Sequence, residues 1–194
     1  MYIIGIFGKI GAGKSSFIDI LKRYIDGEFL SADEENRELL KQKEYLSLLK
    51  EHFPDCFDGS ELNKEKLKTK IFNDSTANEK LRLLSHSTIK SRLYNKILSS
   101  SKKIVFVELS VFVENFLELD EKWLVTASKN KQIKRLCKRD SISESVAENR
   151  IQTQYLPDEN YFDRIIVNDG SFEQLSNTTK DIVRELKTSL NIVE

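Results

Sequence analysis

The residues best suited to chemistry lie at the start of the chain. Residues 8–15 read GKIGAGKS and match the pattern G-x-x-x-x-G-K-[ST]. In this pattern glycines let backbone N–H groups converge on an anion, the lysine supplies an ammonium, and the serine hydroxyl ligates Mg²⁺. An apolar run at 2–7 precedes the pattern and an amphipathic stretch follows it, which is the strand–loop–helix context that such a loop needs. The pattern therefore predicts a site for a nucleoside triphosphate. Its predicted ligand residues are Gly8, Gly11, Gly13, Lys14 and Ser15.

Two carboxylates follow other predicted strands. Asp33 comes directly after a short run at 28–32, and Glu108 lies near the end of a longer run at 103–109. Because the carboxyl ends of parallel strands form the ligand-binding edge of an open sheet, both side chains are candidates for that edge. Asp33 can accept the proton of an attacking hydroxyl or help to hold Mg²⁺, and Glu108 can reach Mg²⁺ through a water. On residue type alone, an N-cap for a helix from residue 34 explains Asp33 better, and that alternative stays open.

Five basic residues lie at helical spacing between 131 and 139. Their offsets of 0, 3, 4, 7 and 8 place them on one helical face. Such a face is either simply solvated or the cationic surface of a lid that closes over the transferring phosphate and excludes water. In a chain with a phosphate loop both interpretations stay open. The five residues are Lys131, Lys134, Arg135, Lys138 and Arg139.

Composition and the remaining motifs argue against several classes of protein. The 31 Lys and Arg balance 31 Asp and Glu, so no net field attracts nucleic acid or a membrane, and neither is expected as a partner. A guanine-specific switch would carry N-K-x-D, but residues 130–133 read NKQI, and no G-x-G-x-x-G indicates a dinucleotide site. Cys56 and Cys137 are too isolated for a disulfide framework or a zinc site, which favours a reducing, cytoplasmic location.

Apolar runs that alternate with amphipathic stretches predict an α/β fold with a parallel sheet. Strands are expected at 2–7, 28–32, 103–109, 122–127 and 164–167. Helices are expected from 14, at 34–53, 63–72, 78–99, 130–138 and 143–155, and from 171, where Ser171 and Gln174 form a capping box. Residues 54–62 are expected to form a turn. The stretch between the second and third strands is longer than one crossover requires, which predicts an inserted lobe that covers a substrate.

In order and at matching spacings, the motifs resemble those of the dephospho-CoA kinases along nearly the full chain. They are the loop at 8–15, SADEENR (31–37), DGSEL (58–62), HSTI (86–89), ELSVFVE (108–114), QIKRLCKR (132–139), RIQTQ (150–154) and FDRIIVNDG (162–170). The resemblance implies one three-layer P-loop kinase domain over 1–194, with a five-stranded parallel sheet, a substrate-binding lobe at 34–100 and a lid at 129–157. It implies an ATP cradle over Gly11–Ser16, which adds Ala12 and Ser16 to the ligand residues of the loop. It also implies catalytic roles for Lys14, Asp33 and Arg139, substrate binding by Asp33, Arg37 and His86, and Mg²⁺ binding by Ser15 and, through water, Glu108.

The resemblance also implies a reaction. The γ-phosphate of ATP would pass to the ribose 3′-hydroxyl of dephospho-CoA, giving CoA and ADP, with Mg²⁺ as cofactor and a monomeric, cytoplasmic enzyme. Five residues depart from the family pattern: Phe7 replaces a usual Thr, Lys9 a Gly, Ser31 an Asp, and Ser87 and Ser110 each a Pro. Because the last three departures lie on the acceptor side, two alternatives stay open. One is a kinase for another nucleoside or nucleotide, and the other is an ATP-binding module without catalysis.

Overall fold

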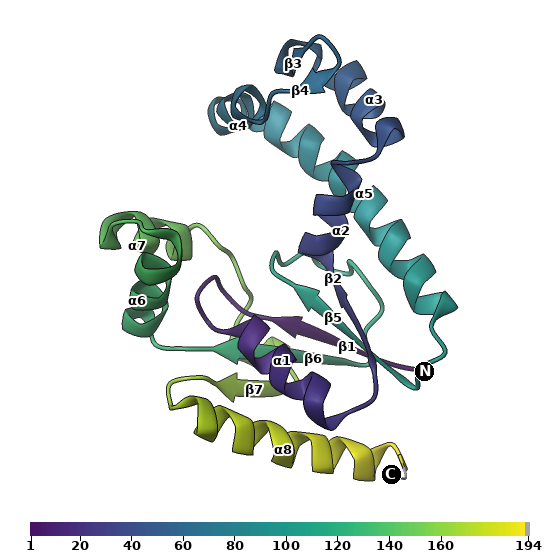
Figure 1. Cartoon of the computed structure of the whole chain (residues 1–194), viewed down its shortest axis with the longest axis vertical. Coiled ribbons are helices and arrows are strands. Elements are labelled where there is room, and N and C mark those ends of the chain that lie inside the picture. The colour runs from purple at the N-terminus through teal and green to yellow at the C-terminus, as the bar shows by residue number, and fades with distance from the viewer. Residues whose placement is uncertain (193–194) are drawn as a thin grey trace. The chain divides into compact units, whose positions relative to one another are not determined.

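The strand β1, Tyr2–Phe7, lies in the middle of a five-stranded parallel sheet with the order β2-β5-β1-β6-β7 (Figure 1). The other strands are β2 (Glu28–Ser31), β5 (Ile104–Leu109), β6 (Glu121–Thr126) and β7 (Arg164–Val167). Ile4 and Ile6 are fully buried, as expected for a central strand that is covered on both faces. The sheet confirms the α/β prediction, and each strand lies within one residue of its predicted bounds.

The computed structural model describes residues 1–192. By their contacts these residues form two compact units. The first unit is Met1–Ser31 together with the chain from Ser100 onward, and it contains the whole parallel sheet. The second unit is Ala32–Ser99.

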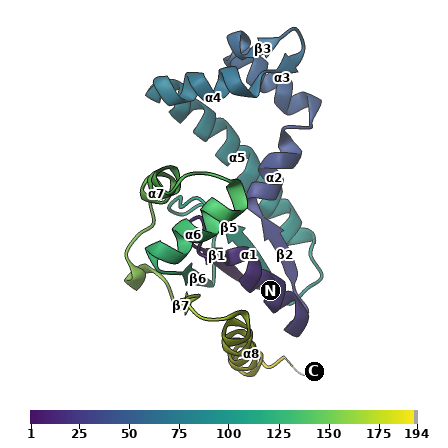
Figure 2. The same ribbon diagram turned by 60° about the vertical axis from the view of Figure 1, so that its left-hand side comes forward.

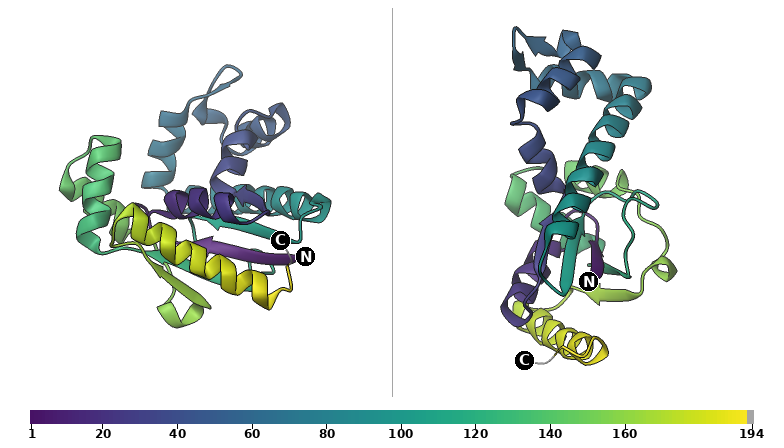
Figure 3. Two further views of the ribbon diagram at one scale, coloured as in Figure 1. Left: turned by 60° about the horizontal axis from the view of Figure 1, so that its bottom comes forward. Right: turned by 90° about the vertical axis from the view of Figure 1, so that its right-hand side faces the viewer.

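Two helices of the first unit, α1 (Lys14–Tyr24) and α8 (Phe172–Ser189), lie side by side against the sheet (Figures 1 and 3). Phe17 of α1 and Leu186 of α8 belong to the same buried cluster as Trp123 of β6. The capping box predicted at the start of α8 is present. The Ser171 hydroxyl accepts the Gln174 N–H at 3.2 Å, and the Gln174 side chain accepts the Ser171 N–H at 2.7 Å.

A helical hairpin follows β6 in the first unit. It consists of α6 (Lys129–Asp140) and α7 (Glu144–Gln152), and the short helix η2 (Glu159–Tyr161) leads from it to β7. Leu136, Ala147 and Ile151 form a small apolar cluster inside the hairpin, distinct from the main core. The two helices of the hairpin therefore pack against each other through this separate cluster. The chain joins the hairpin to β6 at one end and to β7 at the other.

The second unit is helical with one small hairpin (Figure 2). Its elements are α2 (Ala32–Leu39), α3 (Lys43–His52), η1 (Pro54–Cys56), β3 (Phe57–Asp58), β4 (Glu61–Leu62), α4 (Lys64–Asn73) and α5 (Ser75–Ser99). The antiparallel β3–β4 pair turns at Gly59, whose φ of 65° is left-handed. Within residues 1–192, the helices include none that is long and apolar enough to cross a bilayer.

One prediction for the second unit was wrong, and another was incomplete. The single helix expected at 34–53 is two helices, α2 and α3. The turn expected at 54–62 is present at 59–60, but η1 and the β3–β4 pair around it were not predicted. The break between α2 and α3 lets Leu39 and Tyr45 both be buried. Because these residues are six positions apart, a continuous helix would place them on different faces.

Candidate active site

The phosphate loop joins β1 to α1 and closes on itself. The Ala12 N–H donates to the Lys9 carbonyl at 3.1 Å, and Lys14 Nζ donates to the Gly8 carbonyl at 2.8 Å. Lys14 is only 8% exposed, whereas Ser15 and Ser16 are exposed in the first turn of α1. An ammonium, two hydroxyls and a helix N-terminus therefore lie within one helical turn. This combination suits an anion that carries several charged oxygens.

The loop requires its glycines for two reasons. Gly13 has a φ of 98°, a left-handed conformation that side chains disfavour, and a Cβ there would lie 2.0 Å from Asn168 Nδ2. A Cβ on Gly8 would lie 2.4 Å from the carbonyl oxygen of Val125. Gly13 is also the N-cap of α1, and a glycine adds no side-chain oxygen to the first-turn N–H groups. The first turn therefore keeps its donors for a ligand.

Two residues outside the loop hold its carbonyl groups. Arg135 of α6 donates from Nη1 to the carbonyl oxygens of Gly11 and Ala12, both at 3.1 Å, and from Nη2 to the carbonyl oxygen of Asn168 at 2.9 Å. Asn168, directly after β7, donates from Nδ2 to the same Ala12 carbonyl at 2.9 Å and is 6% exposed. The loop is thus braced from α6 and from the end of β7.

A third brace comes from the segment after α7. The Ile10 N–H donates to Gln154 Oε1 at 2.6 Å. Arg135 lies within the helical hairpin and Gln154 just after it, so the hairpin and the segment that follows it each contact the loop. These contacts connect the phosphate loop to the segment that was expected to form a lid.

The structure accounts for some departures from the family pattern. Phe7, 4% exposed, packs against Phe112 and Phe162 with ring centroids 6.1 and 5.5 Å apart, so an aromatic cluster takes the place of the usual threonine. Ser87 lies within the continuous helix α5, where a proline would remove a backbone hydrogen bond and distort the helix. Nothing in the structure explains the side chain of Lys9.

Glu108 lies one residue before the end of β5 and is half-buried. The strand register pairs it with Ile6 of β1 and with Ser31 of β2. It therefore stands at the carboxyl edge of the sheet, beside the strand that leads into the phosphate loop. Residues 1–192 contain no group of three or more His, Cys, Asp or Glu side chains that could hold a metal by themselves.

Arg139 lies in the last turn of α6 and is exposed. Its Nε and Nη2 donate to the two carboxylate oxygens of Asp140 at 2.7 and 3.0 Å, and Arg150 of α7 donates to the same carboxylate at 3.0 Å. The hydrogen bond from Arg139 is the main cause that lowers the pKa of Asp140, so the carboxylate stays charged. Asp140 thus holds two arginines of the hairpin at one point.

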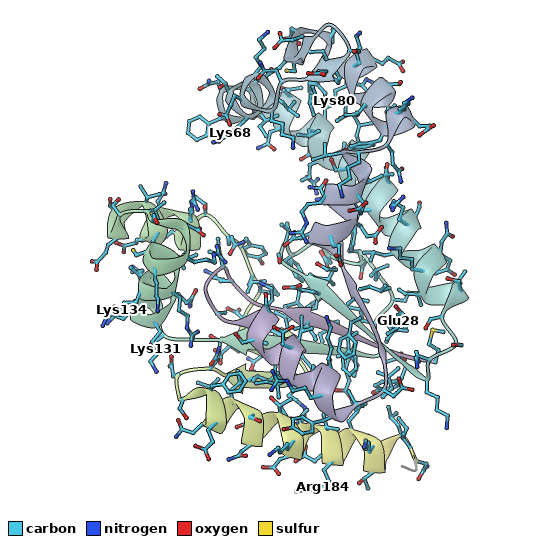
Figure 4. The ribbon with its side chains drawn as sticks, viewed as in Figure 1. Glu28, Lys68, Lys80, Lys131, Lys134 and Arg184 are labelled. Atoms are coloured by element: carbon cyan, nitrogen blue, oxygen red, sulfur yellow. The ribbon has the colours of Figure 1, made fainter. Side chains whose placement is uncertain are left out.

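The basic face predicted at 131–139 is divided in the structure. Lys134, Lys138 and Arg139 are exposed, whereas Lys131 and Arg135 are half-buried. Figure 4 labels Lys134 beside α6 and Lys131 near the start of that helix. Arg135 instead donates to carbonyl oxygens of the phosphate loop, a contact that neither interpretation of this face predicted.

In the second unit, α2 has one exposed face and one buried face. Asp33 and Arg37, one turn apart on the same face, are both exposed, whereas Glu35 and Leu39 are buried. The helix starts at Ala32, so Asp33 is its second residue and not its N-cap, and that alternative was wrong. The start of the helix moves because β2 ends at Ser31 and α2 follows without a linking turn. A carboxylate in the first turn is favoured by the helix dipole.

Glu35 is a buried carboxylate, 2% exposed, that joins α2 to α5. It accepts a hydrogen bond from Arg92 Nε at 2.8 Å and a second one from Lys96 Nζ. Burial raises the pKa of Glu35, but the hydrogen bonds from Lys96 and Arg92 together lower it by more than burial raises it. The pKa of Glu35 therefore lies below its ordinary value. The ion pairs fix the helix that carries Asp33 and Arg37 to α5.

Glu35→Gln is expected to lower the free energy of unfolding by about 1–3 kcal/mol at pH 7, because it removes a buried charge that pairs with the half-buried Arg92 and the exposed Lys96. Since the folded pKa lies below the unfolded value of about 4.3, this stabilisation is present above that value and is lost as the pH falls through the folded pKa. Urea unfolding at pH 7 and pH 3 measures both effects. Glu38→Gln, which alters an exposed pair with Lys41, is the matched control and should change stability by less than about 1 kcal/mol. Equal losses in the two variants would contradict the role given to Glu35.

His86 lies near the middle of α5 and is half-buried. Burial lowers its pKa, Arg82 lowers it further, and Glu79 opposes the shift. The imidazole is therefore neutral at pH 7 and can donate one hydrogen bond and accept another. This suits a group that orients a substrate more than one that carries a fixed charge.

Three residues at the phosphate loop received no individual role from the sequence. They are Arg135, Gln154 and Asn168, which bind the loop by hydrogen bonds. Each lies inside a motif that matched the family pattern: QIKRLCKR, RIQTQ and FDRIIVNDG. These motifs were the signal that could have pointed to the three residues. Their contacts with the loop join residues that are more than 120 positions apart in the chain, and local spacing cannot predict such contacts.

The comparisons with known proteins agree with this geometry. A family model described as dephospho-CoA kinase matches residues 2–174. The dephospho-CoA kinase of Prochlorococcus marinus subsp. pastoris is 32% identical, over 93% of this chain and 94% of that protein. That of Lactococcus lactis subsp. lactis is 30% identical, over 95% and 96%. The crystal structure of TT1252 from Thermus thermophilus matches with a TM-score of 0.81 at 27% identity, over 95% of this chain and 97% of the other. The fold, the phosphate loop and these matches together place the chain in the dephospho-CoA kinase family.

Proposed function

We propose that this kinase transfers the γ-phosphate of ATP to the ribose 3′-hydroxyl of dephospho-CoA through the phosphate loop, Asp33 and Arg139. The observation that supports this most strongly is the closed loop, in which Lys14 is buried beside Gly8 and the hydroxyls of Ser15 and Ser16 begin α1. The ATP phosphates would accept hydrogen bonds from the loop N–H groups and from Lys14. This preorganised positive environment stabilises the charge of the transferring phosphoryl group.

On the acceptor side we propose that the lobe expected at 34–100, most of which lies in the second unit, Ala32–Ser99, binds the substrate. Asp33 would accept the proton of the 3′-hydroxyl or orient that hydroxyl for attack, and Arg37, one turn along the exposed face, would bind an anionic group of the substrate. The neutral imidazole of His86 would add a hydrogen bond. The exposure of Asp33 and Arg37 supports these roles, because an ion pair with buried neighbours would compete with the substrate.

The residues at the loop fit Mg²⁺. Ser15 offers an exposed hydroxyl and Glu108 a half-buried carboxylate at the carboxyl edge of the sheet. Mg²⁺ in kinases takes only one or two protein oxygens, with phosphates and waters as the other ligands, so a dedicated cluster of acids is not needed. Ser15 would bind the ion directly and Glu108 through water. The ion would neutralise charge on the phosphates during transfer.

Arg139→Ala is expected to lower kcat by about 10²-fold while the melting temperature changes by less than about 2 °C. The reason is that an exposed guanidinium in a proposed lid, over 129–157, contributes to the charge of the transition state and little to packing. Steady-state kinetics and thermal unfolding measure the two effects. Arg184→Ala, which removes an exposed arginine from α8, serves as the control with unchanged kcat. Loss of folded protein, with normal turnover in the remainder, would show that Arg139 is structural.

The acceptor is tested by comparing kcat/KM for dephospho-CoA with that for a panel of nucleosides and nucleoside monophosphates at fixed MgATP. We expect kcat/KM for dephospho-CoA to be higher by at least about 10²-fold. The reason is that polar side chains that bind specific groups of one acceptor discriminate strongly against acceptors that lack those groups. ADP formation with a nucleoside monophosphate and no CoA from dephospho-CoA would assign the departures at Ser31, Ser87 and Ser110 to a change of substrate.

We further propose that the protein acts as a monomer in the cytoplasm. The support for the compartment is that Cys56 and Cys137 are both free thiols, which a reducing environment preserves. Light scattering coupled to size-exclusion chromatography tests the oligomeric state. A species near 22.5 kDa is the expected result.

A further inference from the structure

One peptide group in the phosphate loop is held by two donors from outside the loop. The carbonyl oxygen of Ala12 accepts a hydrogen bond from Arg135 of α6 and another from Asn168 after β7. Arg135 also holds the preceding carbonyl, that of Gly11, and the carbonyl of Asn168 itself. A single guanidinium thus joins the loop, α6 and the end of β7. Three of its five N–H donors bind backbone carbonyl oxygens.

The direction of the Ala12 carbonyl decides the direction of the next N–H. In a trans peptide the carbonyl of one residue and the N–H of the following residue point to opposite sides. The Ala12–Gly13 peptide is trans, so a carbonyl held toward Arg135 and Asn168 sends the Gly13 N–H the other way. The Gly13 N–H therefore lies opposite these two braces, where an anion would accept its hydrogen bond.

The conformation of Gly13 alone does not fix the orientation of the Ala12–Gly13 peptide. Its φ of 98° is one of several conformations that glycine adopts at similar cost, so the peptide before it is able to rotate. A rotated peptide would present the Ala12 carbonyl in place of the Gly13 N–H, and a carbonyl oxygen repels a phosphate. The loop therefore needs an external group that selects one orientation before the ligand arrives.

We propose that Arg135 is a positioning residue that preorganises the phosphate loop by fixing the carbonyls of Gly11 and Ala12. This inference rests on the proposed function only in that the loop binds the phosphates of a nucleotide. It assigns Arg135 a different task from Arg139, although both lie on the basic stretch of α6. Arg139 would act on the transferring group, whereas Arg135 acts on the loop. The positive guanidinium also lies beside the loop, which favours an anion there.

The test compares two ligands, MgATP and magnesium tripolyphosphate, by isothermal titration calorimetry with wild type and Arg135→Ala. Because the Gly13 N–H would face the phosphates of either ligand, we expect both affinities to fall by the same factor, about ten-fold or more. The ¹⁵N-labelled Gly13 amide should also shift in the ligand-free protein. The control, Arg184→Ala, removes an exposed guanidinium that Figure 4 shows on α8, and it should leave both affinities unchanged.

Two results would overturn the proposal. A weaker affinity for MgATP with an unchanged affinity for tripolyphosphate would show that Arg135 contacts the nucleoside part directly. Unchanged affinities for both ligands, with only a lower melting temperature, would make Arg135 a structural brace. If the alanine variant does not fold, Arg135→Lys keeps the charge but not the three-carbonyl contact, and the same equal loss is expected. Neither probe involves the acceptor, so a failure of CoA formation would leave this test intact.

Asn168 provides an independent check within the same peptide group. Since Arg135 and Asn168 share the Ala12 carbonyl, their effects on tripolyphosphate affinity should be coupled. Each single variant changes the Kd for tripolyphosphate by some factor. The Kd of the double variant Arg135→Ala/Asn168→Ala is therefore expected to differ by at least about three-fold from the value obtained by multiplying the two single factors. Strict additivity would contradict a shared action on the loop.

Discussion

Lys14→Met is expected to lower kcat by about 10²–10³-fold, because it removes the ammonium that we propose stabilises negative charge on the transferring phosphoryl group. Methionine keeps an unbranched apolar stem of similar length at a site that is 8% exposed, so the fold should be retained. The hydrogen bond from Lys14 to the Gly8 carbonyl is lost in the variant. Initial-rate kinetics at saturating ATP and acceptor measure the effect.

The control for this prediction is Lys22→Met, which removes an exposed lysine from the last turn of the same helix. Its kcat should match wild type within about two-fold, since surface substitutions away from the site have small effects. Equal activity in Lys14→Met and wild type would remove Lys14 from the chemistry and leave it a structural role in closing the loop.

Asp33→Asn is expected to lower kcat by at least about ten-fold and to leave the affinity for ATP nearly unchanged. The amide keeps the size of the side chain but cannot accept the proton of the attacking hydroxyl. Because Asp33 is exposed in the first turn of α2, the substitution disturbs no packing. Steady-state kinetics and calorimetric titration of ATP separate the two quantities.

Glu38→Gln is the matched control, since it removes a carboxylate from the same helix that pairs only with the neighbouring Lys41 at the surface. It should keep the wild-type kcat. Full activity in Asp33→Asn would reduce Asp33 to a charge that favours the N-terminus of α2 through the helix dipole. A large loss in the control would instead indicate that α2 tolerates no change of charge.

The first unit could be predicted from local patterns because its signals are local. Continuous apolar runs such as YIIGIF are typical of buried parallel strands, and β1 has the bounds that this run indicates. The phosphate loop and the capping box at Ser171 are likewise short patterns in which each residue has its own stereochemical reason. Such features depend little on distant residues.

The missed features depend on contacts between distant residues. Arg135 belongs to a run of basic residues, and its sequence position does not distinguish it from Lys134, although one binds the loop and the other is exposed. Glu35 stands in the acidic run of α2, where a solvated side chain is the usual expectation, but Arg92 and Lys96 of α5 bury and neutralise it. The break between α2 and α3 has no glycine or proline to mark it and follows from burial of both Leu39 and Tyr45.

The central claim is that the phosphate loop of this chain serves CoA formation. The most direct test incubates the purified protein with MgATP and dephospho-CoA and follows the products by ³¹P NMR. We predict ADP and CoA in equal amounts, with the new phosphate on the ribose 3′-hydroxyl and none formed by Lys14→Met on the same time scale. ATP binding without CoA formation, or ADP release without a 3′-phosphate, would contradict the claim.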